Sequence, residues 1–317
     1  PAHHLRPAPG DMASPPPPSP PPSPLPEGFK QIVSGTAAGF ASTLVVHPLD
    51  TVRTRIQTAE ISGVKFAGAF DCAAKTWRHE GWRAFYKGLA SPLAASGVYK
   101  AVIFATYHSA LGRIAPASGT GPPGIPSVML AAGVAGGVNS FVVTPVELVR
   151  NNLMVQYGRR GAGGGRRAGS YAGAGDVVRR TVAESGVLGL WRGAASTFLR
   201  DSFGVAVWFG TFEGSQRHLC PALGLAGMPG LLFSGVVGGF GFWAAAFPLD
   251  TIKSLIQVGS HGSEGTGPSA IRTLMGNLYR SGGIRRLYRG FGVAVLRGLP
   301  SSAITFAVQR KVREAMG

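Results

Sequence analysis

The chain has 317 residues, of which 45% are hydrophobic and 14% charged, with a formal net charge of +17. The charged fraction lies well below the roughly 25% of a soluble domain, which favours an apolar body with basic ends. The basic residues are scattered singly and no nucleic-acid-binding motif occurs, so nucleic acid is not an expected partner. Two cysteines, Cys72 and Cys220, are too few for a disulfide framework.

The chain opens with a stretch, residues 1–26, that is rich in proline, alanine and serine. It includes the run Pro15–Pro18, which is typical of a polyproline tail, and it cannot supply the apolar core of a cleavable signal peptide. We predict a disordered tail over these residues and exclude it from the fold.

Six long apolar segments follow the tail, with polar, glycine-containing stretches between them. In chain order they cover residues 28–58, 89–114, 127–155, 194–219, 229–258 and 291–315. Each is long enough to cross a bilayer as a tilted helix, yet polar and charged residues interrupt all of them. Such residues are tolerated in a membrane where they face a bundle interior, so the segments are expected to surround a polar cavity.

The first, third and fifth segments end in one pattern, Pro-x-acid-x-x-base, which begins at Pro48, Pro145 and Pro248. Copies roughly a hundred residues apart indicate a threefold repeat. Each proline kinks its helix, so the acid and base that follow are expected to meet those of the other copies. A ring of ion pairs that can open is a gate. The ring residues are Asp50, Arg53, Glu147, Arg150, Asp250 and Lys253.

A second pattern, aromatic-base-Gly, precedes the second, fourth and sixth segments and ends at Gly88, Gly193 and Gly290. Together the patterns divide the chain into the tail and three repeats, at residues 27–120, 121–224 and 225–317. The first helix of each repeat also carries small residues four apart, for which we predict close helix packing. These pairs are Gly35 and Gly39, Ala132 and Gly136, and Gly235 and Gly239.

With both patterns in register three times, the chain resembles the mitochondrial carrier family over about residues 28–316. The resemblance implies an all-α membrane protein with six transmembrane helices in three pseudo-symmetric repeats, and short matrix-side helices around a central cavity. It implies a monomer in the mitochondrial inner membrane, with both termini towards the intermembrane space, that works by alternating access. In the ring, it implies pairing of Asp50 with Arg150, Glu147 with Lys253, and Asp250 with Arg53.

Some positions depart from the family pattern. Gln57 and Gln257 match the glutamines that brace the ring, whereas Met154 occupies the position in the second repeat, so we expect two braces. The gate at the opposite end should carry an acid in each repeat, but only Glu213 is one. We expect this gate to close by packing and hydrogen bonds; the alternative is a protein that no longer transports. The middle repeat also carries a Gly/Arg-rich insertion at residues 158–173, interpreted as a solvated loop.

The resemblance also indicates where substrate should bind. Seven residues past the three pattern glycines stand Ala95, Arg200 and Arg297, and Asp201 follows Arg200. The Arg-Asp pair resembles that of the branch that carries basic amino acids, carnitine and acylcarnitines. Arginine suits a carboxylate and the aspartate suits an ammonium group, so a zwitterion satisfies both. The plain alternative is an internal ion pair.

Two neighbouring residues modify this substrate prediction. Tyr99 stands where basic amino acid carriers tend to have a glutamate, and its ring suits a quaternary or apolar-tailed ligand. The absence of that glutamate counts weakly against lysine, arginine or ornithine as the substrate. Lys100, the next residue, would instead favour a dicarboxylate.

Anionic lipid, which the resemblance implies to be cardiolipin, is the expected membrane partner. Helix N-termini present unpaired N–H groups that attract phosphates. The expected lipid-binding glycines are Gly68, Gly88, Gly173, Gly193 and Gly290. The third repeat reads Pro268-Ser269-Ala270 where the others have aromatic-x-Gly, so its site should be weaker.

The sequence thus predicts a transporter rather than an enzyme. The seven histidines lack metal-ligand spacing, and we expect no metal, cofactor or catalytic residue. The favoured function is exchange of an amino acid, carnitine or acylcarnitine-like zwitterion. A dicarboxylate or other carboxylate carrier, and a non-transporting accessory subunit with the same fold, remain as alternatives.

Overall fold

The structure is a computed structural model that describes residues 27–59, 63–115, 122–156, 170–259 and 267–316. Every regular element in these ranges is a helix. The predicted tail at residues 1–26 and most of the insertion at 158–173 lie outside the described residues.

Six long helices match the six apolar segments. They are α1 (Glu27–Gln57), α3 (Ala90–Ile114), α4 (Ile125–Met154), α6 (Ala194–Gly214), α8 (Gly227–Val258) and α10 (Phe291–Ala315). A π-helical turn, η3 (Ser215–Leu219), and the short α7 (Cys220–Ala222) extend α6. The pattern prolines lie inside α1, α4 and α8, as a kinked helix requires.

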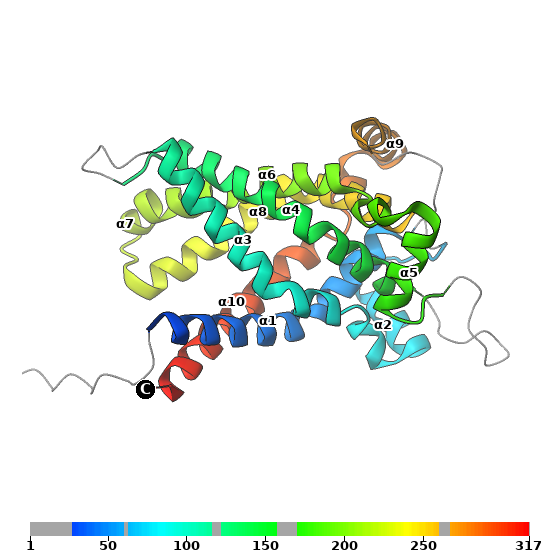
Figure 1. Cartoon of the computed structure of the whole chain (residues 1–317), viewed down its shortest axis with the longest axis horizontal. Helices are drawn as coiled ribbons and strands as arrows, with labels where there is room; N and C mark the ends of the chain where they lie inside the picture. Colours follow the sequence, from blue (N-terminus) through cyan, green and yellow to red (C-terminus); the bar gives the residue numbers. More distant parts are fainter. Residues whose placement is uncertain (1–26, 60–62, 116–121, 157–169, 260–266, 317) are drawn as a thin grey trace, which may run out of the picture.

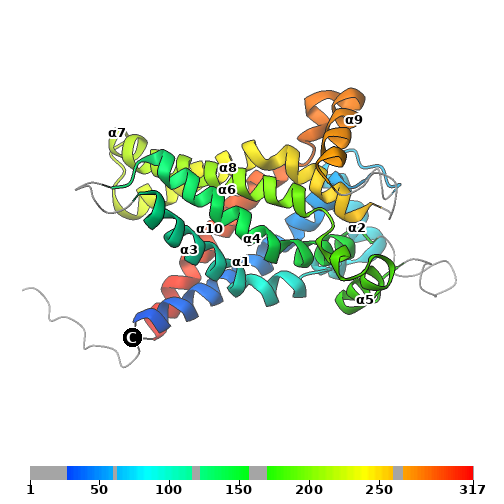
Figure 2. The same ribbon diagram turned by 45° about the horizontal axis from the view of Figure 1, so that its top comes forward.

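Shorter helices follow each proline pattern. They are α2 (Ala69–Glu80) with the 3-10 helix η1 (Trp82–Tyr86), α5 (Ala174–Ser185) with η2 (Val187–Trp191), and α9 (Pro268–Leu287). These helices gather at one end of the molecule, which we call the ring end (Figure 1). The start of α1, the C-terminus and α7 lie at the opposite end (Figure 2). The long helices therefore connect two ends of different character.

Each short helix covers the last turns of the long helix before it. Cys72 of α2 packs with Val52 and Ile56 of α1, and Val177 of α5 packs with Leu148 and Val149 of α4. A third, larger cluster forms between α8 and α9. Burial of these apolar faces holds the short helices against the bundle and fixes the ends of the proline-containing helices.

The long helices do not pack equally. α1 lies along α10, α4 lies between α3 and α6, and α6 lies along α8, whereas α1 with α3 and α8 with α10 meet over short stretches. At Gly136 of α4 an added Cβ would stand 2.4 Å from the Asp201 carbonyl oxygen, so only glycine allows that approach. At Gly235 and Gly239 such an atom would meet nothing within 4 Å. The predicted close packing there is wrong.

A lysine accounts for the loose contact between α1 and α3. Twelve residues past their pattern glycines, α6 carries Val205 and α3 carries Lys100. Val205 lies against Gly136, whereas the longer Lys100 places its Nζ 2.8 Å from a Cβ built on Gly39 and donates to the Gly35 carbonyl oxygen at 3.1 Å. The bulk and charge of Lys100 thus hold the two helices apart.

By length and composition, four stretches of the described residues qualify as membrane spans: Trp82–Ile114, Ile125–Met154, Gly227–Val258 and Pro268–Ala315. They contain α3, α4, α8 and α10. α1 and α6 are not among them, and both carry several charged residues, including Asp50, Arg53 and Arg55 in α1 and Arg200 and Asp201 in α6. These charges are buried or partly buried within the bundle, which is where a membrane helix tolerates them.

Candidate functional site

Three ion pairs join the ends of α1, α4 and α8 in a closed ring. Arg150 Nη2 lies 2.5 Å from Asp50 Oδ2, and Arg53 Nη2 lies 3.2 Å from Asp250 Oδ2. Lys253 donates to Glu147 and closes the ring. Each pair joins two different repeats, so the ring holds the three repeats together at this end.

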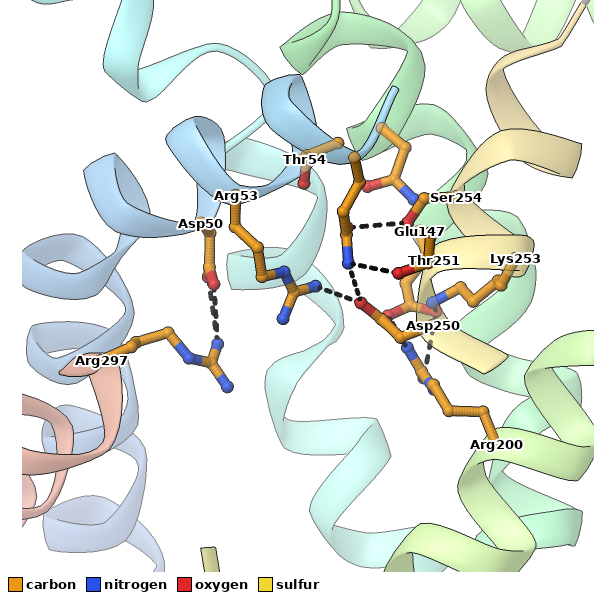
Figure 3. A network of polar contacts seen from close by, with 12 residues as sticks. Asp50, Arg53, Thr54, Glu147, Arg200, Asp250, Thr251, Lys253, Ser254 and Arg297 are labelled. Carbon is orange, nitrogen blue, oxygen red and sulfur yellow. Dashed lines mark hydrogen bonds and ion pairs between the residues drawn. The ribbon is translucent and has the colours of Figure 1, made fainter. Parts of the chain in front are cut away.

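Two further arginines, one on α6 and one on α10, reach the same carboxylates. Arg297 of α10 donates to both oxygens of Asp50, at 2.9 and 3.2 Å. Arg200 of α6 donates to Glu147 at 3.2 Å and to Asp250 at 3.1 Å. Figure 3 shows both guanidinium groups directed at ring carboxylates. Every acid of the ring therefore has a second basic partner.

Asp201 completes this charge network. Its Oδ1 accepts from Arg200 Nε at 2.7 Å, and the side chain is almost fully buried. The network then holds five bases (the ring bases, Arg200 and Arg297) and four acids (the ring acids and Asp201). One positive charge is in excess inside the bundle, which favours a ligand that brings a negative group.

The other predicted substrate residues lie on α3. The hydroxyl of Tyr99 is buried and has no hydrogen-bond partner among the described residues, and Tyr99 interacts electrostatically with Glu147 and Asp201. Ala95, one turn earlier, is partly buried. The amine of Lys100 instead contacts Gly35 of α1, so the structure separates it from the arginines with which it was grouped.

Trp243 of α8 belongs to the network and was missed in the sequence. The guanidinium carbon of Arg53 lies 4.6 Å from its ring centroid, and that of Arg297 lies 5.2 Å away. Both distances are in the cation–π range. The sequence contains a signal for this residue: five residues before the pattern proline, the third repeat has a tryptophan, whereas the other two repeats have Thr43 and Ser140.

The two predicted braces behave differently. Gln57 donates to Asp250 Oδ2 at 3.0 Å and so supports the pair with Arg53. Gln257 accepts a 2.7 Å hydrogen bond from Asn151, and its Nε2 has no partner among the described residues. Of these two glutamines, only Gln57 contacts a ring carboxylate in the described part of the chain. Asn151, one residue past the ring base of its repeat, takes the oxygen of Gln257.

The predicted lipid glycines stand at helix starts near the ring end. Gly68, Gly173, Gly193 and Gly290 precede α2, α5, α6 and α10, and Gly88 lies two residues before α3. Gly88 has φ 79°, and a Cβ there would stand 2.9 Å from the carbonyl oxygen of Arg150. The positive φ and the close carbonyl oxygen each require glycine at this position, independently of any lipid. Lipid binding stays a prediction.

At the opposite end, the acid expected at the second gate pairs within its own helix. Glu213 accepts from Arg217 at 2.7 Å, four residues on. Aromatic side chains contact across helices there instead: the rings of Tyr107 on α3 and Phe209 on α6 have centroids 4.6 Å apart. Among the described residues this end therefore has aromatic contacts where the ring end has inter-repeat ion pairs.

Three stretches of this sequence, residues 26–114, 122–222 and 226–317, each match the family described as "Mitochondrial carrier protein". The chain belongs to the mitochondrial carrier family. Members of this family are transporters rather than enzymes, and the all-helical, three-repeat structure has the fold that the resemblance implied.

Several curated carriers are similar over nearly their full length. A protein of Dictyostelium discoideum, "Mitochondrial substrate carrier family protein S", is 32% identical over 92% of this chain and 98% of its own. An Arabidopsis thaliana "Mitochondrial carnitine/acylcarnitine carrier-like protein" is 31% identical over 92% and 99%. The Saccharomyces cerevisiae "Mitochondrial ornithine transporter 1" is 31% identical over 87% and 92%. The names of these relatives differ in the substrate, so identity of about this level shows a mitochondrial solute carrier and leaves the solute open.

Proposed function

We propose that this carrier exchanges a small zwitterion, namely an amino acid, carnitine or an acylcarnitine, by alternating access across the mitochondrial inner membrane. The observation that supports the proposal is the buried Arg200–Asp201 pair, with Arg297 in the same charge network. Two guanidinium groups offer donors to a carboxylate, and the aspartate offers a counter-charge to an ammonium or quaternary amine. The relatives named for carnitine and ornithine transport zwitterionic or cationic amines of this chemistry.

The arginines link substrate binding to the gate. In the structure, Arg297 is held by Asp50, and Arg200 is held by Glu147 and Asp250. A substrate carboxylate that pairs with either arginine competes with a ring carboxylate for the same N–H groups. Binding therefore removes one partner from ring acids and favours opening, which is differential affinity for two states.

The positive end of the substrate has two candidate contacts. Asp201 supplies a carboxylate, and the aromatic faces of Trp243 and Tyr99 supply cation–π surfaces for a quaternary amine. Trp243 is engaged by Arg53 and Arg297, so a substrate cation can replace a guanidinium there once Arg297 turns to the substrate carboxylate.

The family resemblance supplies the orientation in the membrane. With the short helices on the matrix side, both described ends of the chain lie towards the intermembrane space. A closed ring then corresponds to the state that is shut on the matrix side. The gate on the other side, where Glu213 is paired with Arg217, closes by aromatic packing such as that of Tyr107 with Phe209.

Exchange in proteoliposomes tests the proposal. The purified protein is reconstituted with amino acids, carnitine, acylcarnitine or dicarboxylates inside and labelled substrate outside. Arg297→Ala is expected to lower exchange at least about tenfold, since a lost charge-assisted hydrogen bond is worth roughly 1.5–3 kcal/mol. Arg179→Ala, an exposed residue of α5, is the matched control and should leave exchange unchanged.

Asp201→Asn distinguishes the alternatives. It should reduce exchange of zwitterions far more than exchange of dicarboxylates. Robust dicarboxylate exchange together with zwitterion exchange that ignores Asp201→Asn would replace the proposal with a carboxylate carrier. Absence of exchange for every substrate, with the protein folded by its thermal transition, would support the non-transporting accessory subunit.

A further inference from the structure

A buried carboxylate at the end of α2 anchors the first repeat. Glu80 accepts hydrogen bonds from Arg55 at 2.7 and 3.1 Å and also pairs with Lys87, and its side chain is 4% exposed. Thr76 accepts a further bond from Arg55 at 2.9 Å. The carboxylate therefore neutralises the buried Arg55 and the partly buried Lys87 at one point.

The same cluster reaches the second repeat. Arg55 donates to the Met154 carbonyl oxygen at 2.9 Å, and Lys87 donates to that of Gln156 at 2.7 Å. Met154 is the last residue of α4, where helix carbonyls lack intrahelical partners, and Gln156 lies two residues beyond it. Glu80 thus orients two cations that join repeat 1 to repeat 2 at the ring end.

Counting from the pattern residues gives the equivalent positions one repeat later. Asn152 replaces Arg55, Arg192 replaces Lys87, Thr181 replaces Thr76, Gln257 replaces Met154, and Ser185 replaces Glu80. Ser185 ends α5 as Glu80 ends α2, and both helices have 12 residues. The second repeat therefore keeps a cation, a hydroxyl and two amide groups, with a serine at the position of Glu80.

A cavity of about 90 Å³ is lined by four of these five residues, all except Ser185. Its polar lining includes Asn152, Thr181, Arg192 and Gln257. Gln257 is 2% exposed, and its Nε2 is a buried donor with no partner among the described residues. The volume suits about three waters or one small oxyanion. A buried, unmatched donor beside a cation is the environment that an anion stabilises.

The third repeat fills the equivalent position with apolar side chains. Leu255 replaces Arg55 and Leu278 replaces Thr76, and both are buried in the hydrophobic cluster between α8 and α9. Of the three repeats, the first thus places a carboxylate at this position, the third packs apolar side chains around it, and the second has the polar lining with Ser185 in place of the acid.

We propose that this pocket binds a small oxyanion, a carboxylate or a phosphate group, in the position that the Glu80 carboxylate occupies in the first repeat. The walls come from both sides of a repeat boundary: Asn152, Thr181 and Arg192 belong to repeat 2, and Gln257 to repeat 3. A bound oxyanion joins these repeats beside the ring. It therefore stabilises the closed ring and slows the opening of the carrier at this end.

Thermal unfolding of the whole protein tests the site without any transport assay. The protein is held in a neutral, lipid-free detergent with chloride, acetate or inorganic phosphate at equal ionic strength. Acetate or phosphate is expected to raise the Tm by about 2 °C or more over chloride. Ser185→Glu supplies the missing carboxylate, so it should raise the Tm in chloride and abolish the further rise with acetate or phosphate.

Two further arms make the outcome decisive. Glu80→Ser copies the second repeat into the first, and should lower the Tm in chloride and enlarge the rise with acetate. Cardiolipin, added in place of the soluble anions, distinguishes a lipid phosphate from a free one: stabilisation that Ser185→Glu removes assigns the site to the lipid headgroup. Equal Tm values in all salts would overturn the proposal. So would a rise in Tm, with acetate, phosphate or cardiolipin, that is the same in Ser185→Glu as in the unchanged protein.

Discussion

At the scale of single residues, the main feature is that each ring carboxylate is shared. Asp50 holds Arg150 and Arg297, Glu147 holds Lys253 and Arg200, and Asp250 holds Arg53 and Arg200. Removing Asp50 therefore leaves Arg150 and Arg297 without an acid, whereas removing a ring base leaves its acid with another cation. The two kinds of substitution should not be equivalent.

Asp50 and Arg150 provide the test of this asymmetry. Asp50→Asn is expected to destabilise the protein by about 3 kcal/mol or more, since it leaves two partly buried guanidinium groups uncompensated. Arg150→Gln should cost about 1.5 kcal/mol, because Asp50 keeps Arg297. Thermal unfolding in detergent gives the comparison. A larger loss of Tm in Arg150→Gln than in Asp50→Asn would contradict the shared-carboxylate reading.

The six ring residues could be placed from sequence because their positions relative to proline repeat three times. The second partners could not. Arg200 and Arg297 were expected to bind substrate, and only the packing of α6 and α10 brings them to the ring acids. Gln257 shows the same limit, since its position in the pattern cannot show that Asn151 takes its oxygen.

At the scale of the elements, α2 is fastened through its last residue. Burial alone raises the pKa of Glu80, but the hydrogen bonds and charges of Arg55 and Lys87 outweigh it and hold this pKa below its ordinary value of 4.5. The ionised carboxylate is thus part of the contact between α2, α1 and the end of α4. Neutralising it should loosen all three.

Glu80→Gln gives a pH-dependent prediction. Because the folded pKa is depressed, the stability from ionised Glu80 is fully present above about pH 4.5 and is lost as the pH falls through the folded pKa. Glu80→Gln should therefore lower the Tm clearly at pH 7, and the difference from the unchanged protein should shrink below pH 4.5. Tm series at matched ionic strength measure it; a difference that stays constant over this range would exclude the ionised carboxylate as its source.

The extents of the long helices could be predicted because apolar segments, proline patterns and glycines mark them. How tightly they pack could not. Small residues four apart occur in all three repeats, but the contact also depends on the partner helix, where Val205 allows close approach and Lys100 prevents it. A pattern on one helix does not specify the side chain that will face it.

At the scale of the whole molecule, the two ends differ in the kind of contact that holds them. The ring end has inter-repeat ion pairs with buried acids, and the opposite end has Glu213 paired within one helix and aromatic contacts between helices. Breaking a buried ion pair leaves an uncompensated charge, which costs more than losing an exposed pair or a contact between aromatic rings. The carrier should therefore rest with its ring closed.

Matched glutamine substitutions test that difference. Glu147→Gln leaves Lys253 without its ion-pair partner, while Arg200 keeps Asp250 and Asp201, and it should lower exchange in proteoliposomes at least about tenfold. Glu213→Gln removes only a partly exposed pair within one helix and should change exchange by less than about threefold. Similar losses in the two variants would mean that both ends depend on acids to the same degree.

The pairing of α1 with α10 has a consequence for biosynthesis. The Ser42 and Ser301 hydroxyls lie 2.8 Å apart although 259 residues separate them. The first helix to leave the ribosome thus finds its main neighbour only when the last one has been made, and contacts so distant in the chain form slowly. Until then one side of α1 stays uncovered and is accessible to chaperones or to non-native contacts. A nascent chain that stops before residue 291 lacks the main helix neighbour of α1.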